Sequence, residues 1–202
     1  MRKIAVFYSG RSQHSHTYKT SEFGKYIDAC IPAHNFAEAT LDEFDVLIIP
    51  SLSPINLLDA NAKKIHAFAN EGKTVVVFGS QHREWLPAHK WEFRPTNFWW
   101  SLEPGTDGAL RLTDSTSDLF TNYLTLVDVT WHQHGIYWPT VDCETLVSTA
   151  DGGSILYIDK VNSKGTWVIT TLDPDFHYGS YFMQATERFL RGFLPWLKEG
   201  QI

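Results

Sequence analysis

Three short apolar runs in the first part of the chain constrain its fold most strongly. They are KIAVFY at Lys3 to Tyr8, DVLII at Asp45 to Ile49, and TVVVF at Thr74 to Phe78. Each run has the length of a strand and is almost entirely apolar, a pattern typical of strands buried on both faces of a parallel sheet. A glycine or proline stands within two residues of the end of each run, where it ends a strand. The runs therefore predict three buried strands.

Helical patterns separate these strands. Between the second and third runs, apolar residues repeat at helical spacing, at Leu58, Ala62, Ile65 and Phe68. Gly72 follows them, where a helix end favours a left-handed residue. Between the first and second runs, Phe23, Ile27 and Cys30 predict the apolar side of another helix. Strands that alternate with helices in this way pair in parallel through right-handed crossovers.

The second half of the chain joins an irregular segment to further strands. Residues 80–104 hold several tryptophans among prolines and charges, which predicts a long irregular excursion. Thr130 to Trp138 alternates as a strand does. Ser154 to Val161 and Thr166 to Leu172 are separated by a turn sequence, Asn-Ser-Lys-Gly, and predict a β-hairpin.

A last helical pattern completes the fold prediction. Its inward-facing residues are expected to be Phe182, Ala185, Phe189, Phe193 and Leu197, with a kink or break at Pro195. The chain has 202 residues and no repeat or linker, so residues 1–202 are expected to form one α/β domain. We predict a three-layer sandwich of flavodoxin-like type, with a mainly parallel sheet that the hairpin from Ser154 to Leu172 extends.

Charge and composition exclude several classes of partner. The net charge is −6 and no basic run occurs, so a nucleic acid is not expected to bind. No apolar stretch has the length of a membrane span, and the N-terminal run is too short for a signal peptide. Cys30 and Cys143 form neither a metal-binding spacing nor a disulfide framework, which fits a reducing cytoplasm.

Three segments resemble a known superfamily. They are KIAVFYSG with the histidine-containing loop after it, the block from DVLIIPSLSP to KTVVVFGSQH, and KGTWVITTLDPDFHYG. Together they resemble the class I glutamine amidotransferase-like superfamily, and within it the ThuA-like branch associated with trehalose utilisation. The resemblance implies an α/β sandwich whose third strand leads into an active-site turn, and a sugar or another small polar metabolite as ligand.

The sequence departs from that superfamily at the catalytic positions. In glutamine amidotransferases the third strand runs into a cysteine, whereas the corresponding stretch here is Gly79-Ser80-Gln81-His82. The His-Pro-Glu pattern after the last strand is matched by Asp173-Pro174-Asp175, and His177 follows shortly after. A glutaminase with a Cys-His pair is therefore excluded.

Ser80 is the candidate nucleophile that remains at the active-site turn. His82 or His177 would take its proton, and Asp175 would orient the histidine. The surrounding residues lack the G-x-S-x-G pattern that exposes a serine nucleophile. Ser80 can equally be a helix cap or a hydrogen-bonding residue in a loop.

Histidines follow the predicted strands where parallel sheets place their sites. His14 and His16 follow the first strand, His82 the third, and His177 with Asp175 the last. We expect these side chains to line one pocket as neutral rings, because neighbouring positive charges disfavour protonation. The tryptophan-rich segment would cover this pocket.

The pair His132 and His134 suggests a divalent metal ion. Both rings would face one side of the strand predicted over Thr130 to Trp138, where they could ligate one ion with Asp175 or Glu84. Alternatively, the pair lies on an exposed face without a ligand.

Aromatic side chains give a last candidate set. Trp85 and Trp138 could stack on sugar rings, a function that the ThuA-like resemblance also implies, or they could pack as a cluster beneath the long loop. Trp91, Trp99, Trp100 and Tyr137 share these two interpretations.

Three functions stay open from the sequence. The first is a ThuA-like protein that binds or acts on a small polar metabolite at the histidine-bearing edge, with or without a metal ion. The second is a hydrolase or amidase that depends on Ser80. The third is a catalytically silent binding or assembly module. Whether the chain forms a homo-oligomer is left open.

Overall fold

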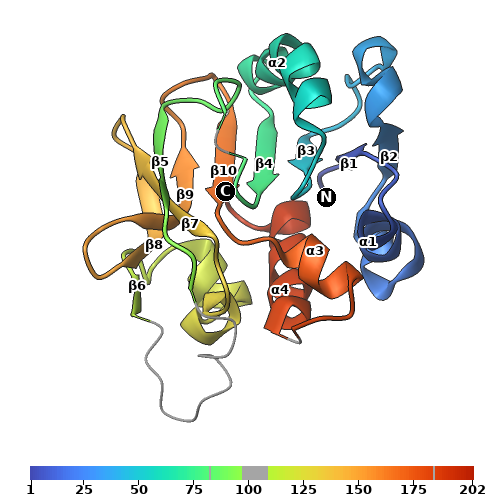
Figure 1. The fold of residues 1–202 in the computed structure, drawn as a ribbon. Coiled ribbons are helices and arrows are strands. Elements are labelled where there is room, and N and C mark those ends of the chain that lie inside the picture. The colour runs from blue at the N-terminus through green and yellow to red at the C-terminus, as the bar shows by residue number, and fades with distance from the viewer. Residues whose placement is uncertain (82, 97–108, 184) are drawn as a thin grey trace.

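One mixed sheet runs through the computed structural model, which describes residues 1–81, 83–96, 109–183 and 185–202. Its parallel half has the order β2 (Ala29–Pro32), β1 (Ile4–Tyr8), β3 (Val46–Ile49), β4 (Thr74–Phe78) and β10 (Thr166–Thr170) (Figure 1). Every neighbouring pair in this half is parallel. The three apolar runs therefore form parallel strands, as their sequence predicts.

An antiparallel half extends the sheet beyond β10. β9 (Ser154–Asp159) pairs with β10 as the predicted hairpin, and it also pairs with β7 (Gly135–Pro139) and β8 (Glu144–Thr149). β5 (His89–Phe93) lies against β7, and β6 (Leu110–Leu112) lies against β8. The prediction of a mainly parallel sheet with an antiparallel extension is confirmed.

Helices cover both faces of this sheet (Figure 1). α2 (Ile55–Asn70) and the short helix η3 (Ala33–Glu38) cover one face. The other face carries α4 (Ala185–Glu199), and its short helices are α1 (Ser12–Ser15), η1 (His16–Thr20), η2 (Glu22–Tyr26), η5 (Leu119–Tyr123), η6 (Leu126–Val129) and α3 (Pro174–Gly179). Among the described residues, no helix is long and apolar enough to cross a membrane.

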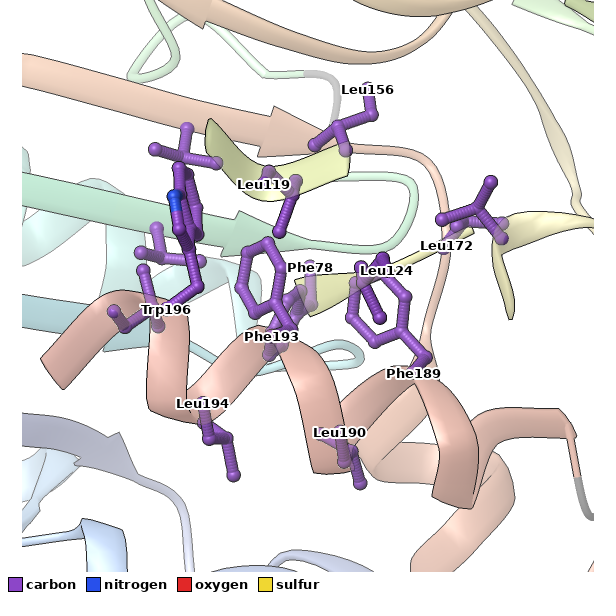
Figure 2. Close-up of a cluster of buried hydrophobic side chains, with 14 of the residues drawn as sticks. Phe78, Leu119, Leu124, Leu156, Leu172, Phe189, Leu190, Phe193, Leu194 and Trp196 are labelled. Carbon is purple, nitrogen blue, oxygen red and sulfur yellow. The ribbon is translucent and has the colours of Figure 1, made fainter. Parts of the chain in front are cut away.

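Strand alternation divides the core into two clusters. Val76 and Phe78 of β4 point to the side of α4, whereas Val75 and Val77 point to the side of α2. In the first cluster the ring of Phe193 lies 5.5 Å from that of Phe78 (Figure 2). Of the kink or break expected at Pro195, the break does not occur, because α4 continues through this residue.

The helix expected between the first two strands is replaced by a short helix and a strand. Phe23 lies in η2, but Cys30 lies in β2 and pairs with Val6 of β1. An added strand satisfies the backbone hydrogen bonds at this edge of β1, which a helix would leave to water. The apolar spacing does not distinguish the two, because a short buried strand and a helix turn have similar patterns over so few residues.

The strand expected from Thr130 to Trp138 begins only at Gly135. Hydrogen bonds to η6 occupy its first residues, because Thr130 Oγ1 donates to the Leu126 carbonyl and Trp131 Nε1 donates to the Asp128 carbonyl. In the segment expected to be irregular, residues 89–93 form β5. Trp99 and Trp100 lie outside the described residues.

The core contact between α4 and β4 gives a first prediction. Phe193→Ala should lower the free energy of unfolding by about 3–5 kcal/mol, because it leaves a cavity against Phe78. Phe93→Ala is the control, since this side chain is 74% exposed and should change stability by less than about 0.5 kcal/mol. Urea denaturation of both variants measures the difference, and equal losses would contradict this packing.

Candidate functional site

Four parallel strands deliver polar residues to one edge of the sheet. β1, β3, β4 and β10 all run in the same direction, so their carboxyl ends lie together. Ser9, Ser51, Ser80 and Asp173 follow these strands within three residues. The chain leaves β1 toward β2 on one side and reaches β3 on the other, which makes this edge a topological switch point. Open α/β sheets place their ligands at such points.

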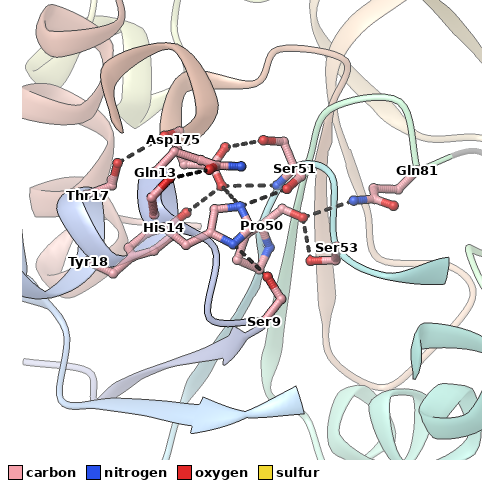
Figure 3. A network of polar contacts seen from close by, with 11 residues as sticks. Ser9, Gln13, His14, Thr17, Tyr18, Pro50, Ser51, Ser53, Gln81 and Asp175 are labelled. Carbon is pink, nitrogen blue, oxygen red and sulfur yellow. Dashed lines mark hydrogen bonds and ion pairs between the residues drawn. The ribbon is translucent and has the colours of Figure 1, made fainter. Parts of the chain in front are cut away.

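A buried cluster around Asp175 lies at this edge (Figure 3). Its carboxylate accepts hydrogen bonds from the Ser51 backbone N–H at 3.0 Å, from Ser51 Oγ at 2.7 Å and from the Tyr18 hydroxyl at 3.2 Å. We call Asp175, Ser51, Tyr18 and His14 the Asp175 cluster. All four side chains are buried. The cluster joins the end of β3 to η1 and α3.

His14 completes the Asp175 cluster as a neutral ring. Its Nε2 lies 2.9 Å from the Ser51 carbonyl oxygen, which can only accept, so Nε2 carries the proton. Its Nδ1 then accepts from Ser9 Oγ at 3.0 Å. Burial lowers the pKa of His14, and the attraction of Asp175 opposes this only in part. Burial likewise raises the pKa of Asp175. Because its hydrogen-bonding groups have partners within the protein, we infer that the Asp175 cluster stabilises the fold.

A second group of side chains meets at Asp173. His134 Nε2 lies 3.4 Å from Asp173 Oδ2, and His177 Nε2 lies 3.2 Å from Asp173 Oδ1. We call His134, Asp173 and His177 the Asp173 cluster. The side chains of Asp173 and His177 are only 4% and 2% exposed, whereas that of His134 is 38% exposed. Solvent can therefore reach this cluster through His134.

The electrostatics of the Asp173 cluster favour an ionised carboxylate. Burial raises the pKa of Asp173, but the contacts with His134 and His177 outweigh it, and the net shift is downward. The same carboxylate raises the pKa of His134. His132 stands beside the cluster, with its ring centre 4.6 Å from that of His134, and burial lowers its pKa. The cluster thus combines a negative oxygen with basic ring nitrogens.

The structure distributes the residues that we expect to line one pocket over two clusters at the same edge of the sheet. His14 and Asp175 lie in the Asp175 cluster and His177 lies in the Asp173 cluster. The carboxylate beside His134 is Asp173, rather than the expected Asp175 or Glu84. Asp173 was not singled out from the sequence, although its spacing to His177 places both on one side of a helix turn. The pleat argument for His132 and His134 does not apply, because both precede β7.

The remaining residues expected at the site are Ser80, His82 and His16. Ser80 is half-buried in the turn after β4, and His82 lies outside the described residues. His16 stacks on Tyr178 with ring centres 5.4 Å apart, and its ring centre is 4.6 Å from that of Tyr181. It therefore belongs to an aromatic group at the rim of α3.

Trp85 and Trp138 have the packing contacts of the second interpretation that their sequence left open. Trp85 is buried in the core cluster on the side of α2, with its ring centre 6.4 Å from that of Trp167. Trp138 is partly buried in β7 and donates from Nε1 to Glu92 Oε2 at 3.0 Å. Burial of large aromatic area accounts for both positions.

Comparisons with known proteins agree with this architecture. No family model and no curated protein sequence matches the chain. A candidate GMP synthase component from Thermoplasma acidophilum has a TM-score of 0.58 at 13% identity, covering 98% of this chain and 94% of its own. The cytoplasmic protein STM1381 from Salmonella typhimurium LT2 has a TM-score of 0.53 at 13% identity, covering 93% and 86%. At such identities the likeness shows the fold alone, which is α/β of glutamine amidotransferase-like type.

Asp175 gives a second prediction. Asp175→Asn should lower the free energy of unfolding by at least about 1–3 kcal/mol, because the new amide group would face the N–H and hydroxyl donors of Ser51 in a buried site. Asp59→Asn on the exposed side of α2 should leave stability unchanged. Thermal and urea denaturation measure both variants, and an unaffected Asp175→Asn protein would refute the structural function of this cluster.

His14 gives a third prediction, on pH. Its folded pKa lies below the ordinary value of 6.5, so the unfolded chain binds more protons as the pH falls through 6.5. The stability that neutral His14 contributes is therefore present above pH 6.5 and is lost below it. Urea denaturation at several pH values should show a shallower acid-side loss for His14→Gln than for the wild type. His34→Gln, at an exposed position, should keep the wild-type profile.

Proposed function

We propose that this protein binds a small polar metabolite of the sugar type at the carboxyl edge of its sheet, beside the Asp173 cluster. The site would combine the histidines of that cluster with an aromatic segment at the end of α3, residues 178–183. The amidotransferase-like fold by itself is compatible with many activities, so the proposal rests on the residues at this site.

One cavity carries the proposal. It has a volume of about 190 Å³ and is lined by Tyr178, Tyr181, Phe182, Met183 and Glu187. Phe182 also contacts the Asp173 cluster, because its ring centre lies 5.5 Å from that of His177. The cavity and the histidines therefore share a wall.

The lining suits a sugar ring. Aromatic faces pack against C–H groups, while the tyrosine hydroxyls and Glu187 can exchange hydrogen bonds with ligand hydroxyl groups. The volume lies below the roughly 300–1,000 Å³ of sites for drug-sized ligands, which fits a single ring. The ThuA-like resemblance of the sequence supports the same class of ligand.

Backbone strain at this wall supports a binding function. Tyr181 has φ 56° and Met183 has φ 71°, in the left-handed region that larger side chains rarely adopt. Such strain is concentrated at ligand sites, where the surrounding structure maintains it. Tyr181 is also 83% exposed, although burial would favour its ring.

The cysteines do not supply a nucleophile at this edge. Cys30 lies in β2 and Cys143 lies between β7 and β8. Burial raises the pKa of Cys30 and raises that of Cys143 to about 12, so both thiols stay protonated at neutral pH. These observations disfavour thiol catalysis at this edge.

Tyr181 gives the test of this function. Glucose, and trehalose through one of its two rings, should bind to the wild type when titrated into the protein and followed by calorimetry and ligand-observed NMR. Tyr181→Ala should weaken binding by about 3- to 10-fold, the value of one aromatic contact. The exposed side chain can be removed without opening the core.

Val161→Ala is the matched control. Val161 is also exposed but lies in the turn between β9 and β10, at the opposite end of β10 from Asp173. The affinity of the Val161→Ala protein for either sugar should equal that of the wild type. Absence of binding to the wild type, or equal affinity in Tyr181→Ala, would reject the proposal and favour a silent assembly module.

A further inference from the structure

The geometry points to a divalent metal site formed by His134, Asp173 and His177, for a first-row cation such as Zn²⁺. One Nε2 or Nδ1 atom of each histidine and one carboxylate oxygen lie within 4.8 Å of one another. Two imidazoles with one carboxylate are a common donor set for such ions when a coordination position is kept open. This site adjoins the cavity of the proposed sugar site, which Phe182 also borders, but the metal can be tested without any sugar.

The distances fit ligands around an ion better than hydrogen bonds. Ligand atoms about 2.0–2.1 Å from a tetrahedral ion lie about 3.3–3.4 Å from one another. The contacts of Asp173 measure 3.4 Å from Oδ2 to His134 Nε2 and 3.2 Å from Oδ1 to His177 Nε2. Charge-assisted hydrogen bonds between such groups are shorter, about 2.7–2.9 Å. Each ring nitrogen is therefore spaced from the carboxylate as a neighbouring metal ligand would be, and all three donor groups lie within 4.8 Å of one another.

The burial of one carboxylate oxygen also supports the site. Asp173 Oδ1 is inaccessible to solvent, and its contact with His177 Nε2 at 3.2 Å does not have hydrogen-bond geometry. Leaving a carboxylate oxygen buried in this state costs free energy, and protein structures rarely do so without a reason. A cation between the carboxylate and the two rings would satisfy this oxygen. The Asp175 carboxylate, by contrast, is saturated with donors.

Surrounding contacts hold the three ligands in place. Thr171 Oγ1 donates to the Gly135 carbonyl at 2.7 Å, which ties the residue after His134 to the strand that leads to Asp173. Trp131 meets the ring of His177 edge-on at 5.8 Å. A Cβ atom at Gly135 would collide with the Glu92 carbonyl and the Trp91 ring, so only glycine fits at this position. Such supporting contacts orient metal ligands in known sites.

His132 stands beside the three proposed ligands as a further candidate metal-binding residue. Its Nδ1 lies 2.9 Å from the Thr96 carbonyl and donates to it, which leaves the basic lone pair on Nε2. Metal-binding histidines are usually fixed by a carbonyl acceptor in this manner. Its ring centre is 6.0 Å from that of His177. The exposed face of His134 leaves room for water or a ligand hydroxyl at the open position.

Zn²⁺ titration of the untagged, EDTA-treated protein tests this site without any sugar. Calorimetry should show one ion per chain, and Co²⁺ should give the visible absorption of a tetrahedral complex. His134→Ala should weaken Zn²⁺ binding by at least about 100-fold, since removing even a supporting contact of a ligand costs 10- to 100-fold. His34→Ala removes an exposed histidine outside the cluster and should bind as the wild type does.

Asp173→Asn provides a second variant, because it keeps the size of the side chain while removing its charge. Zn²⁺ should raise the melting temperature of the wild type and of His34→Ala but not of Asp173→Asn or His134→Ala. Failure of the wild type to bind Zn²⁺, or wild-type affinity in His134→Ala, would overturn the site. Because sugar titrations are run in EDTA and again with Zn²⁺, failure of metal binding and failure of sugar binding are distinguished.

Discussion

The parallel pairing of β10 with β4 decides where the polar side chains of this protein meet. β10 returns from an antiparallel hairpin, yet it runs in the direction of β4, from the pair Thr166–Thr74 to the pair Thr170–Phe78. Its carboxyl end therefore lies beside that of β4, and α3 follows directly at the same edge. With the opposite direction, Asp173 and Asp175 would lie at the far edge of the sheet. Gly79 permits the close approach, since a Cβ there would stand 3.0 Å from the Cβ of Ser51 and 3.5 Å from that of Asp173.

Two carboxylates only two residues apart acquire different properties from this arrangement. Asp175 turns toward neutral donors of η1 and the end of β3, and burial raises its pKa. Asp173 turns toward two imidazoles, which lower its pKa despite burial. Environments that separate the pKa values of neighbouring acids often separate their functions too. Asp175 accordingly fits a structural function in holding α3, while Asp173 is the carboxylate available to a ligand or ion.

The fold of this protein therefore does not determine the chemistry of its site. A solved neighbour at 13% identity has an amidotransferase-like architecture, and Ser80 lies in the turn after β4. At this edge the structure brings together histidines and a buried carboxylate. A small aromatic cavity lies beyond Phe182. A fold supplies an edge where residues can meet, and the residues themselves determine what that edge binds.

The sequence by itself determined the elements whose signals are local. β1, β3 and β4 are apolar runs ended by turn residues, α2 carries a helical period, and the β9–β10 turn has hairpin residues, so each could be predicted. β2, β5 and β6 could not, because short strands at an edge depend on the neighbour that pairs with them. The sequence also marked His134 and His177 as candidates, but it could not choose Asp173 over Asp175. That choice depends on which side of α3 faces the start of β7, and only the pairing of β7, β9 and β10 brings those distant segments together.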